Sequence, residues 1–228
     1  MAEVTLVKVI LVALSLLAFL VNLIFGIFML KRRRILANKM FSLLMFSFCW
    51  WNITEFIMRV TDIDMPTYAL LASRLSFIAV SFIPSIAFSF ILALENRIPN
   101  KKQAVLIILT PLVFIFLNFR GMLVEKVNFS ETFDFFTIVP GSAFPYFAVY
   151  ISLFLVFVIY QLVKFYNTCE NQMVKKRMRY LVIGTVVTSI TVFITDILPP
   201  LLGFAMPPLG SFSTIILTSL TYYSVRGR

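Results

Sequence analysis

Histidine is absent from the 228 residues, and the chain contains only two cysteines and seven glycines. Histidine is the commonest general base and metal ligand of proteins, so its absence excludes histidine-based proteases, di-iron oxidases and phosphorelay sites. The sequence also has no glycine-rich phosphate loop and no metal-ligand spacing. We therefore expect no enzymatic activity, no cofactor and no metal site. An integral enzyme that uses only Asp, Glu or Ser is the one catalytic alternative left open.

Charged residues are also scarce: they make up 13% of the chain, whereas hydrophobic residues make up 61%. Ordinary globular chains are about 25% charged and about 45–50% apolar. Backbone groups in lipid must form their hydrogen bonds internally, and the long apolar runs here do not alternate, so they favour helices over a barrel. The composition predicts a multi-pass protein of the cell membrane, in contact with the lipid bilayer and formed by one domain over 1–228.

The predicted fold is all-α, a seven-transmembrane helix bundle. Each span needs roughly 20 apolar residues, and seven such runs fill the chain. The expected spans are approximately 6–30, 40–61, 67–94, 104–119, 145–166, 179–198 and 206–224. Cys49 falls in a span and Cys169 in a predicted cytoplasmic loop, which argues against a disulfide between them.

Basic residues gather in the first, third and fifth loops and in the tail. Short cytoplasmic loops carry an excess of lysine and arginine, which predicts an outer amino terminus and a cytoplasmic carboxyl terminus. All four basic segments fall on one side only if the number of spans is seven. The net charge of +10 does not indicate nucleic acid, because the basic residues separate apolar runs instead of forming a face with interleaved aromatics.

Two basic clusters are predicted to face a cytoplasmic partner. They consist of Arg32, Arg33, Arg34, Lys175, Lys176 and Arg177. The alternative role for these charges is to set the topology and attract anionic lipid, at about 1 kcal/mol per residue near the surface.

The outer loop 120–144 is long for a bundle connection. The segments 124–127 and 135–139, each bounded by apolar residues, flank a polar stretch, which favours a small β-hairpin. Its aromatic side chains either form a lid over an outer pocket or anchor the loop at the membrane interface. The predicted pocket aromatics are Trp51, Phe133, Phe135 and Phe136. Trp50 and Trp51 are consecutive in a span, so only one of them is expected to face the core.

Four ionisable residues lie in or near the spans, where charge is costly and needs an explanation. They are Glu55, Arg59, Arg74 and Asp196. Glu55 and Arg74 flank the turn between spans two and three at similar distances, so they reach nearly the same depth at about 1.5 Å per residue. We predict a Glu55–Arg74 ion pair, shared with Arg59 from the same helical face. The pair either fixes the helix register or forms the polar floor of an outward-facing pocket.

Asp196 stands before Pro199-Pro200, and a second diproline follows at Pro207-Pro208. A helix rarely passes through such a pair, so we expect the linker to be a stiff, non-helical corner. Asp196 is either an interfacial residue or an inward-facing partner of Arg59 or of a ligand.

Several short motifs, taken together, resemble the seven-transmembrane amino-terminal sensor region of histidine kinases. In that family a basic loop follows span one, a Trp precedes a Glu in span two, and an Arg, an apolar-aromatic stretch and a Pro lie in span three. The corresponding segments here are Lys31 to Arg34, Trp50-Trp51 to Glu55, Arg74 to Ile78, Phe82-Ile83-Pro84, Lys175 to Arg179 with Gly184, the Pro199 to Pro208 corner and Tyr222-Tyr223.

The resemblance covers nearly the whole chain and implies an input domain that senses an external or membrane signal. It also implies a homodimer and coupling through span seven to a cytoplasmic signalling protein. Kinase relatives would continue past Arg228 into a phosphoacceptor helix and an ATP-binding domain. Autokinase activity is therefore not carried over, and we expect either a stand-alone receptor-like subunit or an excised sensor.

The leading functional prediction is therefore a membrane sensor or receptor-like module. Its ligand is a small molecule that the sequence does not name. Two alternatives remain: a small-solute transporter with three-plus-one-plus-three helices, and a structural or assembly subunit of a membrane complex.

Overall fold

The computed structural model describes residues 2–31, 35–204 and 206–225. Most of the described chain is helical, and it contains one small antiparallel sheet. In chain order the elements are α1 (Ala2–Lys31), α2 (Leu36–Val60), α3 (Pro66–Leu94), α4 (Lys101–Phe119), β1 (Val124–Ser130), β2 (Phe135–Pro140), α5 (Phe144–Thr168), α6 (Gln172–Val192), the π-helix η1 (Phe193–Ile197), α7 (Leu198–Leu202) and α8 (Gly210–Val225).

Six helices of the described chain are long and apolar enough to cross a membrane, and α8 is a seventh helix of 16 residues. The sixth span begins at Gln172, earlier than the expected 179, because the Asn171 side chain accepts hydrogen bonds from the first turn of α6. The seventh begins at Gly210, later than the expected 206.

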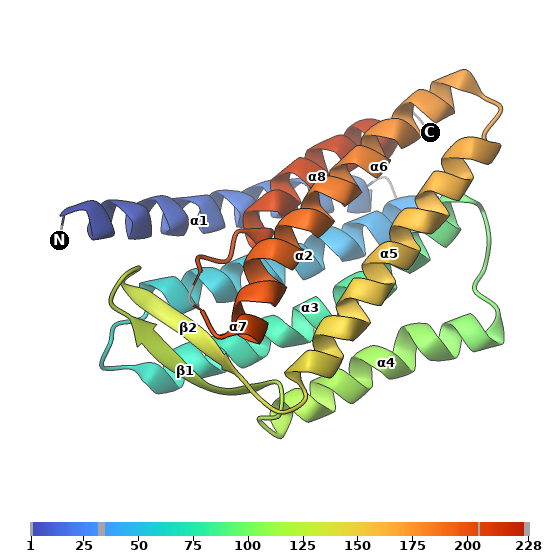
Figure 1. The fold of residues 1–228 in the computed structure, drawn as a ribbon. Coiled ribbons are helices and arrows are strands. Elements are labelled where there is room, and N and C mark those ends of the chain that lie inside the picture. The colour runs from blue at the N-terminus through green and yellow to red at the C-terminus, as the bar shows by residue number, and fades with distance from the viewer. Residues whose placement is uncertain (1, 32–34, 205, 226–228) are drawn as a thin grey trace.

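Helices α1 to α4 pack side by side in chain order, α5 packs on α3 and α6, and α8 closes the bundle by packing on both α6 and α1 (Figure 1). Tyr222 of α8 contacts the rings of Phe25 and Phe28, with centroids 4.6 and 5.6 Å away. Helix α4 lies on the outside of α3 and contributes Phe114, whose ring stacks on Tyr150 of α5. The bundle therefore consists of a closed ring of helices with α4 on its flank.

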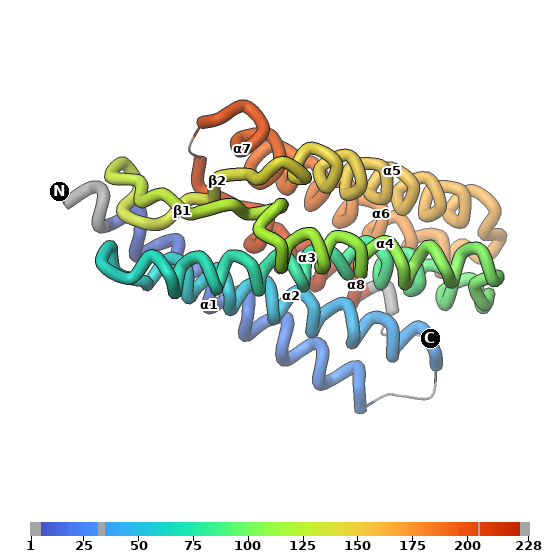
Figure 2. Tube along the Cα trace, turned by 90° about the horizontal axis from the view of Figure 1, so that it is seen from below, coloured from blue at the N-terminus to red at the C-terminus, as the bar shows by residue number. Residues whose placement is uncertain are grey.

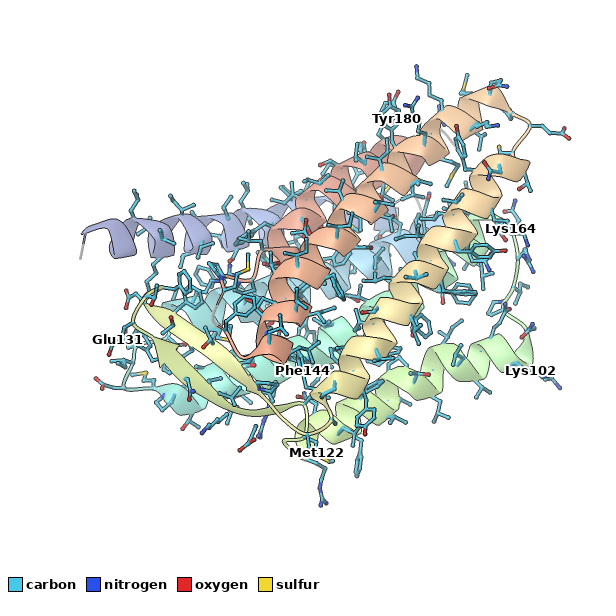
Figure 3. The ribbon with its side chains drawn as sticks, in the orientation of Figure 1. Lys102, Met122, Glu131, Phe144, Lys164 and Tyr180 are labelled. Atoms are coloured by element: carbon cyan, nitrogen blue, oxygen red, sulfur yellow. The ribbon has the colours of Figure 1, made fainter. Side chains whose placement is uncertain are left out.

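The two ends of the bundle differ in character (Figure 2). The hairpin, the start of α1 and α7 lie at one end, which is called the hairpin end below. The turns between α3 and α4 and between α5 and α6 lie at the other end, together with the end of α8. Figure 3 labels Glu131 at the hairpin end, and Lys102 and Lys164 at the opposite end. The basic loops thus share one end of the fold, called the basic end below; Arg32, Arg33 and Arg34 lie outside the described residues.

The predicted hairpin is confirmed. Strands β1 and β2 pair in antiparallel register from Val124 opposite Pro140 to Ser130 opposite Phe135. The turn closes at Asp134, whose φ of 55° is a left-handed conformation that aspartate tolerates. The Asp134 carboxylate lies 3.2 Å from Lys8 Nζ of α1, so the tip of the hairpin is tied to the first helix.

The prediction of a non-helical corner through both diprolines is wrong for the first of them. Pro199 and Pro200 lie in the first turn of α7, directly after the π-helix η1. The preceding π-helix ends with a bond from the Leu198 N–H to the Phe193 carbonyl, so the chain enters α7 without leaving a helical conformation. The helix stops at Gly203 (φ 74°), and the second diproline is non-helical as expected.

Candidate functional site

A cavity of about 420 Å³ lies between the hairpin and the hairpin ends of several helices. Residues of α2, α3, β2, α5, η1 and α7 form its wall, together with the segment that precedes α8. Phe144, labelled in Figure 3, marks the start of α5 beside it. The aromatic residues of the wall are Trp51, Phe77, Phe135, Phe136, Phe144, Phe147 and Phe204. A largely apolar concave site with a few polar groups is typical of small-molecule binding.

Three of the four predicted pocket aromatics line this cavity. Trp51, Phe135 and Phe136 are each at most 5% exposed and belong to the wall. Phe133 does not line the cavity; its ring stacks on Phe135 from outside, with centroids 5.7 Å apart. Phe136 also packs against Met58 of α2 and residues of α3. The position of the hairpin therefore favours the first of the two alternatives for Phe135 and Phe136, in which these side chains cover the cavity.

The two consecutive tryptophans point to different environments, as expected. Trp51 is 5% exposed and faces the cavity, whereas Trp50 is 49% exposed. The Trp50 indole N–H donates to the Leu75 carbonyl of α3, with the two atoms 3.0 Å apart.

Arg59 lies at the centre of the buried charge cluster and has no exposed surface. Its guanidinium is 3.2 Å from Glu55 one turn earlier, and it donates to Ser15 and to the Leu11 carbonyl of α1. It also donates to the Pro208 carbonyl over 2.8 Å. The Phe212 ring of α8 lies 4.8 Å from its carbon Cζ. This one side chain therefore links α1, α2, the segment before α8 and α8 itself.

The predicted Glu55–Arg74 ion pair is wrong. Arg74 donates from Nη2 to the Val124 carbonyl of β1 over 3.3 Å, so its side chain points toward the hairpin. Its own carbonyl accepts from Asn118 of α4 over 2.7 Å. Glu55 pairs with Arg59 instead. The depth argument placed both residues at the hairpin end, but it did not fix the rotation of α3 about its axis.

Asp196 belongs to the charge cluster and also holds the start of α8. Its carboxylate accepts from the Gly210 N–H over 2.9 Å and from the Thr195 hydroxyl. The Thr195 oxygen in turn accepts from the Leu209 N–H over 3.1 Å. Arg59 lies close enough to both Glu55 and Asp196 for electrostatic interaction. The inward-facing alternative for Asp196 is thus the one that the contacts support.

A second buried polar network was not predicted from the sequence. Asn22 of α1 donates to Thr214 over 2.9 Å and accepts from Thr218, both of α8. Asn52 of α2 also reaches Thr214, over 3.4 Å. The i, i+4 spacing of Thr214 and Thr218 places them on one helical face, which is the signal that could have revealed the network. The network fixes α8 against α1 and α2 deeper in the bundle than Arg59.

We expect Thr218→Val to lower the free energy of unfolding by about 1–3 kcal/mol, because it removes the hydroxyl that donates to the buried Oδ1 of Asn22. The matched control is Thr191→Val, whose hydroxyl bonds only to Val187 of its own helix. The midpoint of unfolding by sodium dodecyl sulfate in mixed micelles measures both. Equal shifts for the two variants would contradict the assigned role of the network.

Of the basic residues predicted to face a partner, three are described. Lys175, Lys176 and Arg177 lie in the first turns of α6, at the basic end. The Lys175 ammonium is 5.2 Å from the ring centroid of Tyr166 of α5, and Lys176 is exposed. In the described part of the chain no group of three or more His, Cys, Asp or Glu side chains could hold a metal ion.

The sequence model of a family described as the N-terminal 7TM region of histidine kinase matches residues 14–226. A search among curated proteins gave no match.

Proposed function

Because the chain belongs to the family of N-terminal 7TM regions of histidine kinases, we propose that it is a non-catalytic membrane sensor that binds a small molecule in the cavity under the hairpin. In this proposal the hairpin end faces outward, and the basic end faces the cytoplasm. The occupied cavity changes the position of α8, which passes the signal to a cytoplasmic partner at its far end.

The observation that carries the proposal is the double role of Thr195 and Asp196. Both residues belong to the cavity wall, and both accept hydrogen bonds from the residues that begin α8. In this proposal a ligand that contacts Asp196 alters the hydrogen bonds that fix the first turn of α8. A helix transmits such a shift along its length, here about 24 Å for 16 residues.

The proposed orientation follows the distribution of basic residues. Cytoplasmic loops of membrane proteins carry the excess of lysine and arginine. The turns between α3 and α4 and between α5 and α6, with the described basic residues in and beside them, lie at the same end as the carboxyl end of α8. A signalling protein that docks there would contact α8 and the exposed Lys176 together, and a second copy of the chain could join the same complex.

The π-helix η1 supports a conformational change at this position. π-Helical turns are rare and frequently lie at functional sites. Here η1 carries Thr195 and Asp196, so the irregular turn presents the two side chains that hold α8. A change in hydrogen-bond register within η1 would move both of them together.

Affinity purification from native membranes in mild detergent tests the proposal, with mass spectrometry of proteins and of small molecules. The matched variant is Ser76→Phe, which places a phenyl ring into the cavity wall, with Leu153→Phe on the exposed face of α5 as its control. We expect a signalling protein to co-purify with all three proteins. A retained small molecule should be lost only from Ser76→Phe.

Two outcomes would contradict the proposal. If no signalling protein co-purifies and proteoliposomes show saturable flux of the retained molecule, the chain is a transporter. If neither a signalling protein nor a small molecule is retained, but a complex with other membrane proteins is retained and stays stable when Glu55, Arg59 and Asp196 are neutralised together, the chain is an assembly subunit.

A further inference from the structure

The cavity wall carries acidic groups but no basic ones among the described residues. Glu55 and Asp196 both line it. Arg59 does not, because its guanidinium is turned away toward Ser15, the Leu11 carbonyl and the Pro208 carbonyl. A ligand in this space thus meets two carboxyl groups and no cationic side chain.

The charges of the buried cluster do not balance. Two carboxylates face a single guanidinium, so one negative charge is left over when all three groups are ionised. An unpaired charge in a low-dielectric interior is costly. A positive charge supplied by the ligand would complete the cluster.

Ser73 provides an independent sign that a polar group is missing from the cavity. The residue is 2% exposed and belongs to the cavity wall. Its hydroxyl oxygen has no hydrogen-bond partner within the part of the chain that the structure describes. Buried hydroxyl groups almost always have a partner, so this one fits a group that a ligand would bring.

The remainder of the wall fits an apolar body that carries a cation. Trp51, Phe135, Phe136 and other rings surround the space, and aromatic faces attract ammonium groups within about 6 Å of the ring centroid. An ammonium group has three N–H donors and no acceptor. Glu55, Asp196 and Ser73 offer oxygen acceptors in the same wall.

We propose that the ligand of this cavity is an organic amine, with its ammonium group between Glu55, Asp196 and Ser73 and its apolar body among the aromatic side chains. This inference rests on the proposed function, since it names the ligand class of the same site. The ammonium competes with the Gly210 N–H for Asp196, which links binding to the start of α8.

Three probes with one apolar body and different charges test the ligand class: phenylbutylamine, phenylbutanol and phenylbutyrate. The chain contains two tryptophans, so Trp50→Phe leaves Trp51 in the cavity wall as the single fluorescent reporter. Titrations of this protein in nanodiscs of zwitterionic lipid give the Kd of each probe. We expect the amine to bind about tenfold or more tightly than the alcohol and the acid.

Charge variants show which carboxyl groups cause the preference for the amine. Glu55→Gln and Asp196→Asn should each abolish most of the preference for the amine and leave the affinity for the alcohol unchanged. Glu170→Gln removes the same charge from an exposed position between α5 and α6 and should have no effect. The comparison of probes on the Trp50→Phe protein needs none of these variants, so a variant that fails to fold leaves the test intact.

Failure of the inference and failure of the proposed function give different results. If the alcohol or the acid binds as tightly as the amine, the cavity binds ligands but the ligand class is wrong. If none of the three probes changes Trp51 fluorescence in a saturable way, both the ligand class and the cavity's role as a sensor site are contradicted.

Discussion

Replacement of Arg59 by methionine should destabilise the protein by about 3–5 kcal/mol, among the largest effects of any single substitution in the described chain. The loss of the guanidinium leaves Glu55 buried without its cationic partner and removes the donors to the carbonyls of Leu11 and Pro208. Methionine keeps much of the apolar volume, so the change reports mainly on the polar contacts. The midpoint of unfolding by sodium dodecyl sulfate is the measurement.

Two double-mutant cycles show which partner Glu55 uses. The cycle of Glu55→Gln with Arg59→Met should be strongly non-additive, because each single variant leaves one buried charge alone. The cycle of Glu55→Gln with Arg74→Met should be additive within about 0.5 kcal/mol, since Arg74 contacts Val124 instead. The reverse pattern would contradict the arrangement of the cluster.

Replacement of Gly210 by alanine should detach the start of α8 from η1. A Cβ at this position would lie 2.6 Å from Asp196 Oδ2 and 2.8 Å from Val192 Cγ2, both closer than van der Waals contact allows. Helix propensity alone would favour alanine over glycine by up to about 1 kcal/mol. Overpacking of a tight site costs about 1–3 kcal/mol, so we expect net destabilisation.

Asp196→Ala supplies the control for this substitution, because it removes two of the three nearest atoms. The cost of Gly210→Ala should shrink, or change sign, in the Asp196→Ala background. An equal cost in both backgrounds would show that the close approach of Asp196 is not the reason for glycine at position 210. Thermal unfolding of the purified proteins in one detergent compares the four members of the cycle.

Hydrophobicity and loop composition were sufficient to predict the helical membrane fold and the hairpin. Long apolar runs determine where helices form in lipid, and the segments on either side of the polar stretch in loop 120–144 indicated two strands. The proximity of Glu55 and Arg59 was also predictable from their i, i+4 spacing, whereas the sequence left both an interfacial and an inward-facing position open for Asp196. Family membership agreed with short motifs that extend over most of the chain.

The pairing within the cluster was not predictable from the sequence. The rise per residue gives the depth of Glu55 and Arg74, but the direction of each side chain depends on how the helices pack. The partners of Arg59 include the carbonyls of Leu11 and Pro208, which any residue type provides. Local rules also failed at Pro199, because the chain reaches it through the π-helix η1, which the sequence pattern did not predict.

The central claim is that the occupied cavity changes the position of α8. Spin labels at Lys39→Cys on α2 and Tyr223→Cys on α8, both at exposed positions of the basic end, report the distance between these helices in a background with Cys49→Ala and Cys169→Ser. Filling the cavity by Ser76→Phe should shift this distance distribution, whereas Leu153→Phe on the exposed face of α5 should leave it unchanged. If a folded Ser76→Phe protein gives the same distribution as the parent, the cavity and α8 are not coupled and the sensor account is contradicted.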